Sequence, residues 1–247
     1  MGGILFGVIA IAGGVGLLLA RKSQLNKRLE LRFAETATAQ KVRENCESIG
    51  KDLGSGNYVA TIELKGVVQC DSPLTAEHSK TPCVWYHATT TREYEERVQN
   101  KGGGSATRRG SETVASRQDG TRFSLSDETG TILVDPEGAE IVSKGSFDEF
   151  KPEVERLWGG GRKTVGYRYK EQIVPVGQAL YVFGEASDSD GVLAVRKPTT
   201  KGRFIISVKS EEEMVRDYAG SAKFLYVAGI AALVLGLILI FYGACTG

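Results

Sequence analysis

The sequence predicts a membrane-anchored α+β protein in which two transmembrane helices flank a β-rich antiparallel domain, with a juxtamembrane helix and one inserted helix. The apolar residues of the 247-residue chain are concentrated at its ends, where residues 2–20 and 224–244 contain no charged side chain. Between these ends, apolar and polar residues alternate in short runs separated by turn sequences, which is the pattern of half-buried strands.

Both apolar ends are predicted to span a membrane. At about 1.5 Å per residue, each is long enough to cross a hydrocarbon core of roughly 30 Å. The first is followed by Arg21, Lys22, Lys27 and Arg28, and Lys223 precedes the second. A cleaved signal peptide is the alternative for the first span, but no basic residue precedes its apolar run. Because basic residues beside a span stay on the cytoplasmic side, the domain is expected to be cytoplasmic rather than periplasmic.

Small residues recur along both spans. Gly229, Gly236 and Gly243 are seven residues apart, whereas Ala12, Gly16 and Ala20 are four apart. Stripes of small side chains allow membrane helices to approach closely, so we expect the spans to pair within one chain or between chains of a homo-oligomer. The alternative is that glycine is simply common in membrane helices.

Residues 21–53 are predicted to form a juxtamembrane helix. The segment is rich in charge, lacks proline, and carries Leu25, Leu29 and Phe33 at helical spacing before Gly54-Ser55-Gly56 ends it. We interpret it as a surface helix of the domain, with an oligomerising stalk as the alternative.

Residues 54–215 are predicted to form the β-rich domain. Strands are expected at residues 58–65, 83–95, 122–126, 131–134, 141–143, 165–174, 179–185, 192–196 and 204–208. One helix is expected over residues 147–158, between Ser146 and three consecutive glycines. Residues 100–116, rich in glycine, serine and arginine, are expected to form a mobile loop, either solvated or touching anionic headgroups.

A strand–loop–strand unit over residues 66–86 is the best candidate for a binding surface. Pro73 and Pro82 bracket its polar loop, since proline lacks a backbone donor and favours extended geometry before it. Polar residues on a loop held by a rigid sheet are where binding usually resides. The predicted surface comprises Ser72, Pro73, Leu74, Glu77, His78, Lys80, Arg92 and Tyr94.

Four residues have the types that ligate metals: Cys70, His78, Cys83 and His87. Their spacing lacks the short cysteine pair of structural zinc sites, so a zinc site is one alternative, a Cys70–Cys83 disulfide a second, and ordinary packing the favoured third. A Cys83 nucleophile activated by His78 or His87 is a further alternative. We expect no catalytic residue and no cofactor. Nucleic acid is not expected as a partner, because no aromatic residue is interleaved with the arginines.

Several motifs resemble one known family. They include Gly66-Val67-Val68, Ser72-Pro73-Leu74, the run from Pro82 to Tyr86, Phe123-x-Leu125-x-Asp127-x-Thr129-Gly130 and Gly166-Tyr167-Arg168-Tyr169-x-Glu171. In these residues the chain resembles the GIDE-domain, or "beside-a-membrane" domain, family. That family includes mitochondrial RING-type E3 ubiquitin ligases such as the ligase activator of NF-kappaB, and it has prokaryotic relatives.

The resemblance implies a prokaryotic-like form without the RING. In the ligases the RING follows the second membrane helix, whereas this chain ends at Gly247 and holds only four cysteines and two histidines. We therefore expect a membrane-embedded binding or scaffold protein, oligomeric and linked to membrane stress or protein quality control. Its expected partners are the lipid bilayer, a second copy and a LemA-type membrane protein. The alternative is an E3 ubiquitin-protein ligase-like protein, for which autonomous ligase activity is not expected.

Overall fold

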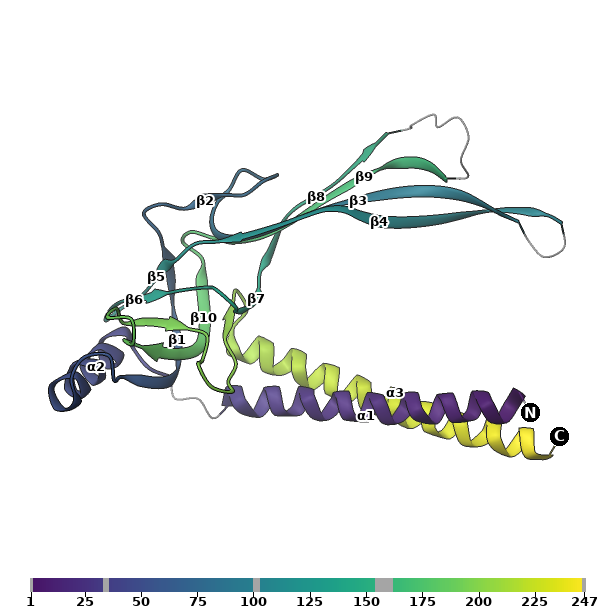
Figure 1. Cartoon of the computed structure of the whole chain (residues 1–247), viewed down its shortest axis with the longest axis horizontal. Coiled ribbons are helices and arrows are strands. Elements are labelled where there is room, and N and C mark those ends of the chain that lie inside the picture. The colour runs from purple at the N-terminus through teal and green to yellow at the C-terminus, as the bar shows by residue number, and fades with distance from the viewer. Residues whose placement is uncertain (1, 33–35, 100–102, 154–161, 246–247) are drawn as a thin grey trace. The chain divides into compact units, whose positions relative to one another are not determined.

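The computed structural model describes residues 2–32, 36–99, 103–153 and 162–245, and it divides into two compact units (Figure 1). One unit, Met1–Glu35 with Lys209–Gly247, is a pair of long helices, and the other, Thr36–Val208, holds two β-sheets and a short helix. The predicted fold class is confirmed, because apolar helices at both ends flank a β-rich domain.

The two long helices are α1, Gly2–Arg32, and α3, Glu211–Cys245. Over Leu5–Asn26 and Glu211–Ala244 they are long and apolar enough to cross a membrane. They pack at glycines, since a Cβ atom added to Gly14 would lie 2.9 Å from the carbonyl oxygen of Gly229, and one added to Gly236 would lie 2.8 Å from that of Gly7. The stripe of Gly229 and Gly236 therefore serves pairing within one chain.

The second predicted stripe is placed differently. Ala12, Gly16 and Ala20 are exposed on the helix pair, and a Cβ atom added to Gly16 would meet nothing within 4 Å. Helix α3 begins with a capping box, in which the Ser210 N–H donates to Glu213 Oε2 at 2.9 Å and the Glu213 N–H donates to Ser210 Oγ at 3.3 Å. This reciprocal pair satisfies backbone donors that a helix start leaves open.

The segment predicted as one juxtamembrane helix, residues 21–53, is divided. Residues 21–32 continue α1, and a separate helix α2 runs from Ala39 to Leu53. The start of α2 is fixed from a distant turn, because the Ala39 N–H donates to Asp127 Oδ2 at 2.7 Å and the Gln40 N–H donates to Thr129 Oγ1 at 3.0 Å. Thr38 is the N-cap residue, since its Oγ1 accepts from the Lys41 N–H at 3.3 Å, and Asp127 and Thr129 supplement this cap from another part of the chain.

Sheet A has seven strands in the order β1-β5-β6-β11-β10-β12-β7. Their bounds are β1 Val59–Gln69, β5 Phe123–Asp127, β6 Gly130–Val134, β7 Glu140–Val142, β10 Ala179–Ser187, β11 Ala194–Arg196 and β12 Ile205–Ser207. Strand β1 also pairs with β10, so five of the strands close into a barrel-like ring. The pairs β11–β6 and β12–β7 are parallel, which departs from the antiparallel prediction.

The main hydrophobic core lies inside the ring formed by the strands of sheet A. Ile62, Leu64, Val182 and Ile206 are buried there with Val42 of α2. The carboxylate of Asp188 joins α2 to the ring, since it accepts hydrogen bonds from the Gly56 N–H at 2.8 Å and the Tyr58 N–H at 2.9 Å. These donors, with the Cys46 thiol, outweigh desolvation and lower the pKa of Asp188.

Sheet B extends from this ring and consists of β2 Leu74–Thr75, β3 Pro82–Gln99, β4 Ser105–Gly120, β8 Lys144–Pro152 and β9 Arg162–Pro175. Its order is β2-β3-β9-β8, with β4 also paired to β3, so that β4 and β8 lie at opposite edges (Figure 1). Trp85 and Val174 reach from its base into the core of sheet A.

Two predictions within sheet B were wrong over the described residues. Residues 147–152 of the inserted helix belong to β8, and the rest of that segment, beyond residue 153, lies outside the described residues. Residues 105–116 of the predicted mobile loop belong to β4, whereas residues 100–102 lie outside. In both places strand pairing overrides local composition, because β8 pairs with β9 and β4 pairs with β3 in long antiparallel ladders.

Candidate functional site

The tip loop, residues 72–80, links β1 to β3 and folds back over the base of sheet B. Strand β2 within it pairs with the first residues of β3, Leu74 with Cys83 and Thr75 with Pro82. The turn is closed by the Ala76 N–H, which donates to the Thr81 carbonyl oxygen at 3.1 Å. Lys80 adopts φ 57°, a left-handed conformation that non-glycine residues take mainly in tight turns.

The carboxylate of Glu171 holds this loop in place from strand β9. Its side chain is buried, at 1% exposure. Oxygen Oε2 accepts a hydrogen bond from the His78 N–H at 2.6 Å, and Oε1 accepts bonds from the Ser79 N–H at 3.2 Å, from Ser79 Oγ at 2.5 Å and from Ser146 Oγ at 2.7 Å. One buried charge thus joins the tip loop, β8 and β9.

These donors keep Glu171 ionised despite its burial. Desolvation raises the pKa of the carboxyl, but the hydrogen bonds from His78, Ser79 and Ser146 outweigh it, so the pKa is lowered from its ordinary value. A buried carboxylate is stable when several donors satisfy it. Glu171 is therefore a structural anion whose oxygens are occupied by the loop that it fixes.

The ring of His78 lies between two aromatic side chains of sheet B. Its centroid is 5.5 Å from that of Phe147 and 5.5 Å from that of Tyr169, which it meets edge-on at 78°. Within the described residues, its buried Nε2 atom has no hydrogen-bond partner. The His78 ring therefore packs the tip loop against β8, through Phe147, and against β9, through Tyr169.

The predicted tip residues differ in their exposure. Ser72, Pro73, Glu77 and Lys80 are exposed, whereas Leu74 is half-buried against a small cluster that includes Ala76, Cys83, Tyr86 and Ile173. The loop therefore offers a proline turn, one acidic and one basic side chain to a partner. Its apolar residues attach it to the sheet.

Arg92 and Tyr94 lie further out along β3. Arg92 Nε donates to Thr164 Oγ1 of β9 at 3.0 Å, and its Nη1 donates to Glu112 Oε1 of β4 at 3.1 Å. The Tyr94 ring has the Arg162 guanidinium 4.8 Å and the Arg92 guanidinium 5.7 Å from its centroid. Arg92 therefore links three strands, and two guanidinium groups lie within cation–π distance of the Tyr94 ring.

The two parts of the predicted surface share one face of sheet B without touching. Tyr169, which packs on His78, is paired with Thr90, and Tyr167 is paired with Arg92. Directly opposite residues lie on the same face, and alternate residues of β3 return to it. A continuous row of aromatic side chains therefore runs along this face, from the tip loop through Tyr169 and Tyr167 to Tyr94.

The four metal-ligating residue types do not form one centre. Among the described residues, no group of three or more His, Cys, Asp or Glu side chains could hold a metal ion. Cys70 Sγ lies 3.8 Å from the Arg122 carbonyl oxygen, and His87 Nε2 lies 3.0 Å from Ser116 Oγ. Cys70 and Cys83 are both free thiols, so the alternative of a disulfide between them is wrong.

Cys83 is also unsuited to act as a nucleophile. Its side chain is fully buried, and desolvation with the nearby Glu171 charge raises the pKa of the thiol to about 11. The reactive species of a cysteine is the thiolate, which is scarce at neutral pH under these conditions. Ordinary packing, the favoured interpretation, accounts for this residue.

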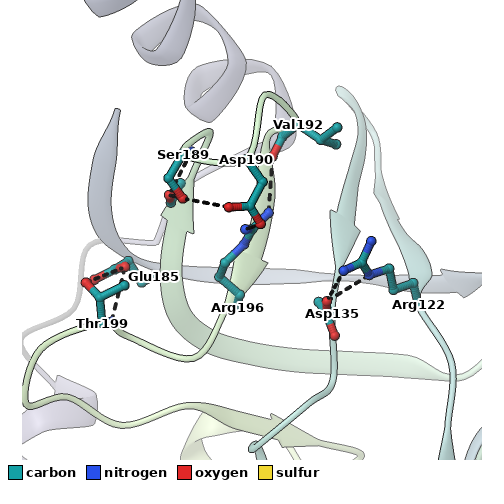
Figure 2. A network of polar contacts seen from close by, with 9 residues as sticks. Arg122, Asp135, Glu185, Ser189, Asp190, Val192, Arg196 and Thr199 are labelled. Carbon is teal, nitrogen blue, oxygen red and sulfur yellow. Dashed lines mark hydrogen bonds and ion pairs between the residues drawn. The ribbon is translucent and has the colours of Figure 1, made fainter. Parts of the chain in front are cut away.

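Two open surface pockets flank Arg122 where β5 begins. One, of about 390 Å³, is lined by residues that include Cys70, Asp71 and Ser72 at the foot of the tip loop. The other, of about 550 Å³, includes Trp85 and Asp135. Between them Arg122 Nε donates to Asp135 Oδ2 at 2.7 Å (Figure 2). Both carboxylate and guanidinium are engaged with one another, so neither pocket presents an unpaired charge at this point.

Sequence reasoning missed Glu171, Tyr169 and Phe147 as parts of this site. A usable signal was present, because Tyr167, Tyr169 and Glu171 alternate on one face of a strand, and a lone glutamate on a half-buried strand face needs donors. Phe147 could not be found, since the segment that contains it was predicted to be a helix.

Comparison with known proteins places the chain in a family. The GIDE family model, described as "E3 Ubiquitin ligase", matches residues 91–241. The chain is also similar to the E3 ubiquitin-protein ligase SPL1 of Arabidopsis thaliana, with 27% identity over 190 residues that cover 72% of this chain and 54% of the relative. It thus spans about half the length of that relative. No solved structure matches it. Because the family model covers more than half of the chain, the protein belongs to the GIDE family of E3 ubiquitin ligases.

Proposed function

We propose that this protein is a membrane-anchored binding module that holds a protein partner against the tip loop and the adjoining aromatic face of sheet B. The observation that carries the proposal is the buried Glu171 carboxylate, which uses its hydrogen-bonding capacity to fix an otherwise exposed loop. A loop fixed in advance loses little conformational entropy when it binds, so pre-organisation favours recognition.

The chemistry of the face suggests the kind of partner. Glu77 and Lys80 are exposed on the tip loop, and the row beyond it presents Tyr169, Tyr167 and Tyr94. Tyrosine supplies a large contact area at low entropic cost and keeps a polar end for hydrogen bonding. A protein segment with alternating apolar and charged side chains, rather than a small molecule, matches so extended a surface.

Site-specific photocross-linking in native membranes tests this function. A photoreactive residue at position 77 is expected to capture a discrete protein adduct that is lost in a Lys80→Glu background. The same residue at position 51, exposed on α2, is the matched control. If positions 77 and 51 capture the same proteins, or if Lys80→Glu leaves the adduct at position 77 unchanged, the tip loop is not the binding surface.

We further propose that the module is a homo-oligomeric scaffold that serves membrane stress responses or protein quality control. The exposed stripe of Ala12, Gly16 and Ala20 supports assembly, because it remains open after the two helices of one chain have paired. A LemA-type membrane protein is the candidate partner that the family resemblance suggests. The mass of the protein in detergent, by light scattering, tests assembly, and a monomer would contradict it.

The orientation is proposed from charge. Arg21, Lys22 and Lys223 border the two apolar segments on the side of the domain, which supports a cytoplasmic domain. A protease site inserted at the exposed Gly103 should be cut only by a cytoplasmic protease. Cleavage by a protease added outside intact cells would place the domain on the opposite side.

Ubiquitin transfer is the second candidate function, favoured by the family description and by the SPL1 relative. The described residues contain no metal-binding cluster of the kind a RING requires, so their part in such a reaction is substrate binding. Purified chain, activating enzyme, conjugating enzyme and ubiquitin are expected to give no conjugates without an added RING. Conjugates that depend on this chain alone would instead establish autonomous ligase activity.

A further inference from the structure

Strand β4, Ser105–Gly120, has one edge without a partner strand. Its register with β3 runs from Ser105 paired with Gln99 to Gly120 paired with Trp85, and none of the described strands pairs with its other side (Figure 1). At roughly 3.4 Å per residue the free edge is about 50 Å long. Such an edge presents a row of backbone donors and acceptors that can template another strand.

This edge of β4 is exposed and is not covered by other described parts of the chain. Every residue of β4 is exposed except Gly110 and Glu112, which are half-buried. Val114 is 49% exposed at the irregularity where the register with β3 shifts, and Val98, paired with Ala106 near the end of the hairpin, is 39% exposed. Apolar side chains beside an open edge are the feature that natural sheets usually avoid unless the edge is covered.

We propose that β4 of one chain pairs antiparallel with β4 of a second copy, with the two Gly110 residues opposite each other, so that two copies of sheet B join into one continuous sheet. The proposal adds an interface in the β-rich domain to the assembly proposed above, which the exposed stripe on α1 supports, and it rests on that part of the proposed function. It is independent of what the tip loop binds.

Side-chain complementarity favours this register. With Gly110 at the two-fold axis, Arg108 of each chain lies opposite Glu112 of the other, and Thr107 lies opposite Thr113. Ala106 lies opposite Val114. Arg108 is exposed and forms no ion pair within the described residues. Opposite charges and threonine pairs placed directly across an antiparallel ladder are both stabilising.

The intrachain contacts already place Glu112 for this role. Its Oε1 accepts a hydrogen bond from Arg92 Nη1 at 3.1 Å, and its Oε2 lies 4.0 Å from Arg162 Nη1. The carboxylate is therefore held above the sheet, and each oxygen can accept a further donor. A guanidinium from a second copy would complete a charge network across the joined strands.

Gly110 suits the two-fold axis because the Tyr94 ring occupies the space above it. A Cβ atom added at Gly110 would lie 2.7 Å from Tyr94 Cζ, so no larger side chain fits without moving the ring. In the joined sheet, the Tyr94 rings of the two copies cover two adjacent glycines. An aromatic ring over a strand glycine restores the packing that the glycine lacks.

Neighbouring registers are less complementary. Centring the pair on Arg109 places Arg109 opposite its own copy, and like charges directly opposite are destabilising. Centring it on Ser111 places Gly110 opposite Glu112 and aligns no ion pair. An unrelated strand would require only backbone bonding, so the self-complementary side chains favour a second copy of this chain.

Disulfide trapping of the full-length chain in its native membrane tests the interface. In the Thr107→Cys/Thr113→Cys variant the two positions of one chain are about 20 Å apart along the strand, too far for a bond within it. The proposed register brings position 107 beside position 113 of the second copy. Mild oxidation is therefore expected to give a covalent dimer on a non-reducing gel, and each single variant measures the background from the native cysteines.

The matched control is Ser105→Cys/Thr113→Cys, with two cysteines on the same face of the same strand but out of register by two residues. Such diagonal neighbours are about 7–8 Å apart, so little dimer is expected. Equal trapping of both pairs would show random collision, and no trapping of either would show that β4 does not pair with itself. Either result would overturn the proposal.

A charge reversal gives an independent measurement. Arg108→Glu places two carboxylates opposite each other at two positions, and we expect dimerisation to weaken roughly tenfold, about 1.4 kcal/mol. Arg117→Glu makes the same change of charge on β4 outside the paired segment and should leave dimerisation unchanged. If the light-scattering mass shows a dimer but the 107–113 bond does not form, the interface is wrong while assembly stands. A monomer would reject both.

Discussion

The backbone N–H of His78 donates a hydrogen bond to Glu171 Oε2 at 2.6 Å, which joins the tip of an exposed loop to a carboxylate that is only 1% exposed. A charge in this position is stable because four donors converge on it. The loop is thereby set at a fixed distance from the strand that carries Tyr169 and Tyr167. Binding at this face would therefore depend on a residue that a partner never contacts.

Replacing Glu171 tests this dependence. Glu171→Gln keeps the shape but turns two acceptor oxygens into one acceptor and one donor, so at least one loop donor loses its partner. We expect the free energy of unfolding to fall by about 1–3 kcal/mol. Chemical denaturation of the detergent-solubilised protein measures it. Glu149→Gln, an exposed position on β8 whose ion pair with Lys151 is on the surface, should change little, and an equal loss there would contradict the interpretation.

The tip loop should be sensitive to acid. The folded-state pKa of Glu171 is lowered, so its contribution to stability is fully present above its ordinary pKa of 4.5 and is lost as the pH falls through the folded value. We expect the susceptibility of the loop to an acid-active protease to rise as the pH falls below 4.5 towards the lowered folded-state pKa. In Glu171→Gln this pH-dependent rise should be absent, and the same pH dependence in wild type and variant would refute the assignment.

The cysteines should differ in reactivity. Cys83 is buried with its thiol pKa raised to about 11, whereas Cys70 is half-buried. At neutral pH a maleimide should therefore modify Cys70 well before Cys83. Mass spectrometry of the digested protein, with complete labelling after unfolding as the reference, provides the comparison. Rapid labelling of Cys83 in the folded protein would restore the nucleophile alternative.

The helix pair should discriminate between neighbouring glycines. A Cβ atom at Gly14 would lie 2.9 Å from both the Gly229 carbonyl oxygen and Leu233, whereas one at Gly13 or Gly16 would meet nothing within 4 Å. Gly14→Leu is expected to cost about 1–3 kcal/mol through overpacking. Gly13→Leu should be tolerated. Cross-linking between cysteines placed on α1 and α3 reports the pairing, and equal effects of the two substitutions would reject the packing described.

The sequence predicted those elements whose residues follow one strong local pattern. Alternation located most strands, and the uncharged ends located both long helices. The helix predicted over residues 147–158 failed because Ser146 and the early glutamates mimic a helix start, although Pro152 lies inside the segment. The pairing of Asp148 with Lys170 and of Phe150 with Arg168 in the ladder decides the structure. The mobile loop predicted for residues 105–116 was wrong for the same reason, since the segment forms a strand by pairing with β3 and its own sequence does not indicate that partner.

The candidate site was only partly predictable. The exposed tip residues could be found from their polarity and their prolines. The residues that hold them could not, because Glu171 and Phe147 lie far from the loop in sequence and meet it only through the order of strands in sheet B. The division of residues 21–53 between α1 and α2 is a similar case, since the Ala39 N–H at the start of α2 donates to the distant Asp127 carboxylate. Long-range contacts of this kind leave no periodic signal.

The glycine contacts between α1 and α3 also constrain how the chain can change over time. The space beside Gly14 on α1 is filled by Leu233 of α3, and the space beside Gly7 is filled by Ile240. Added bulk at Gly14 or Gly7 would also meet the carbonyl oxygen of Gly229 or Gly236, so a smaller side chain at the facing position would not make room for it. Both positions should therefore remain glycine among relatives, whereas the neighbouring Gly13 is free to vary.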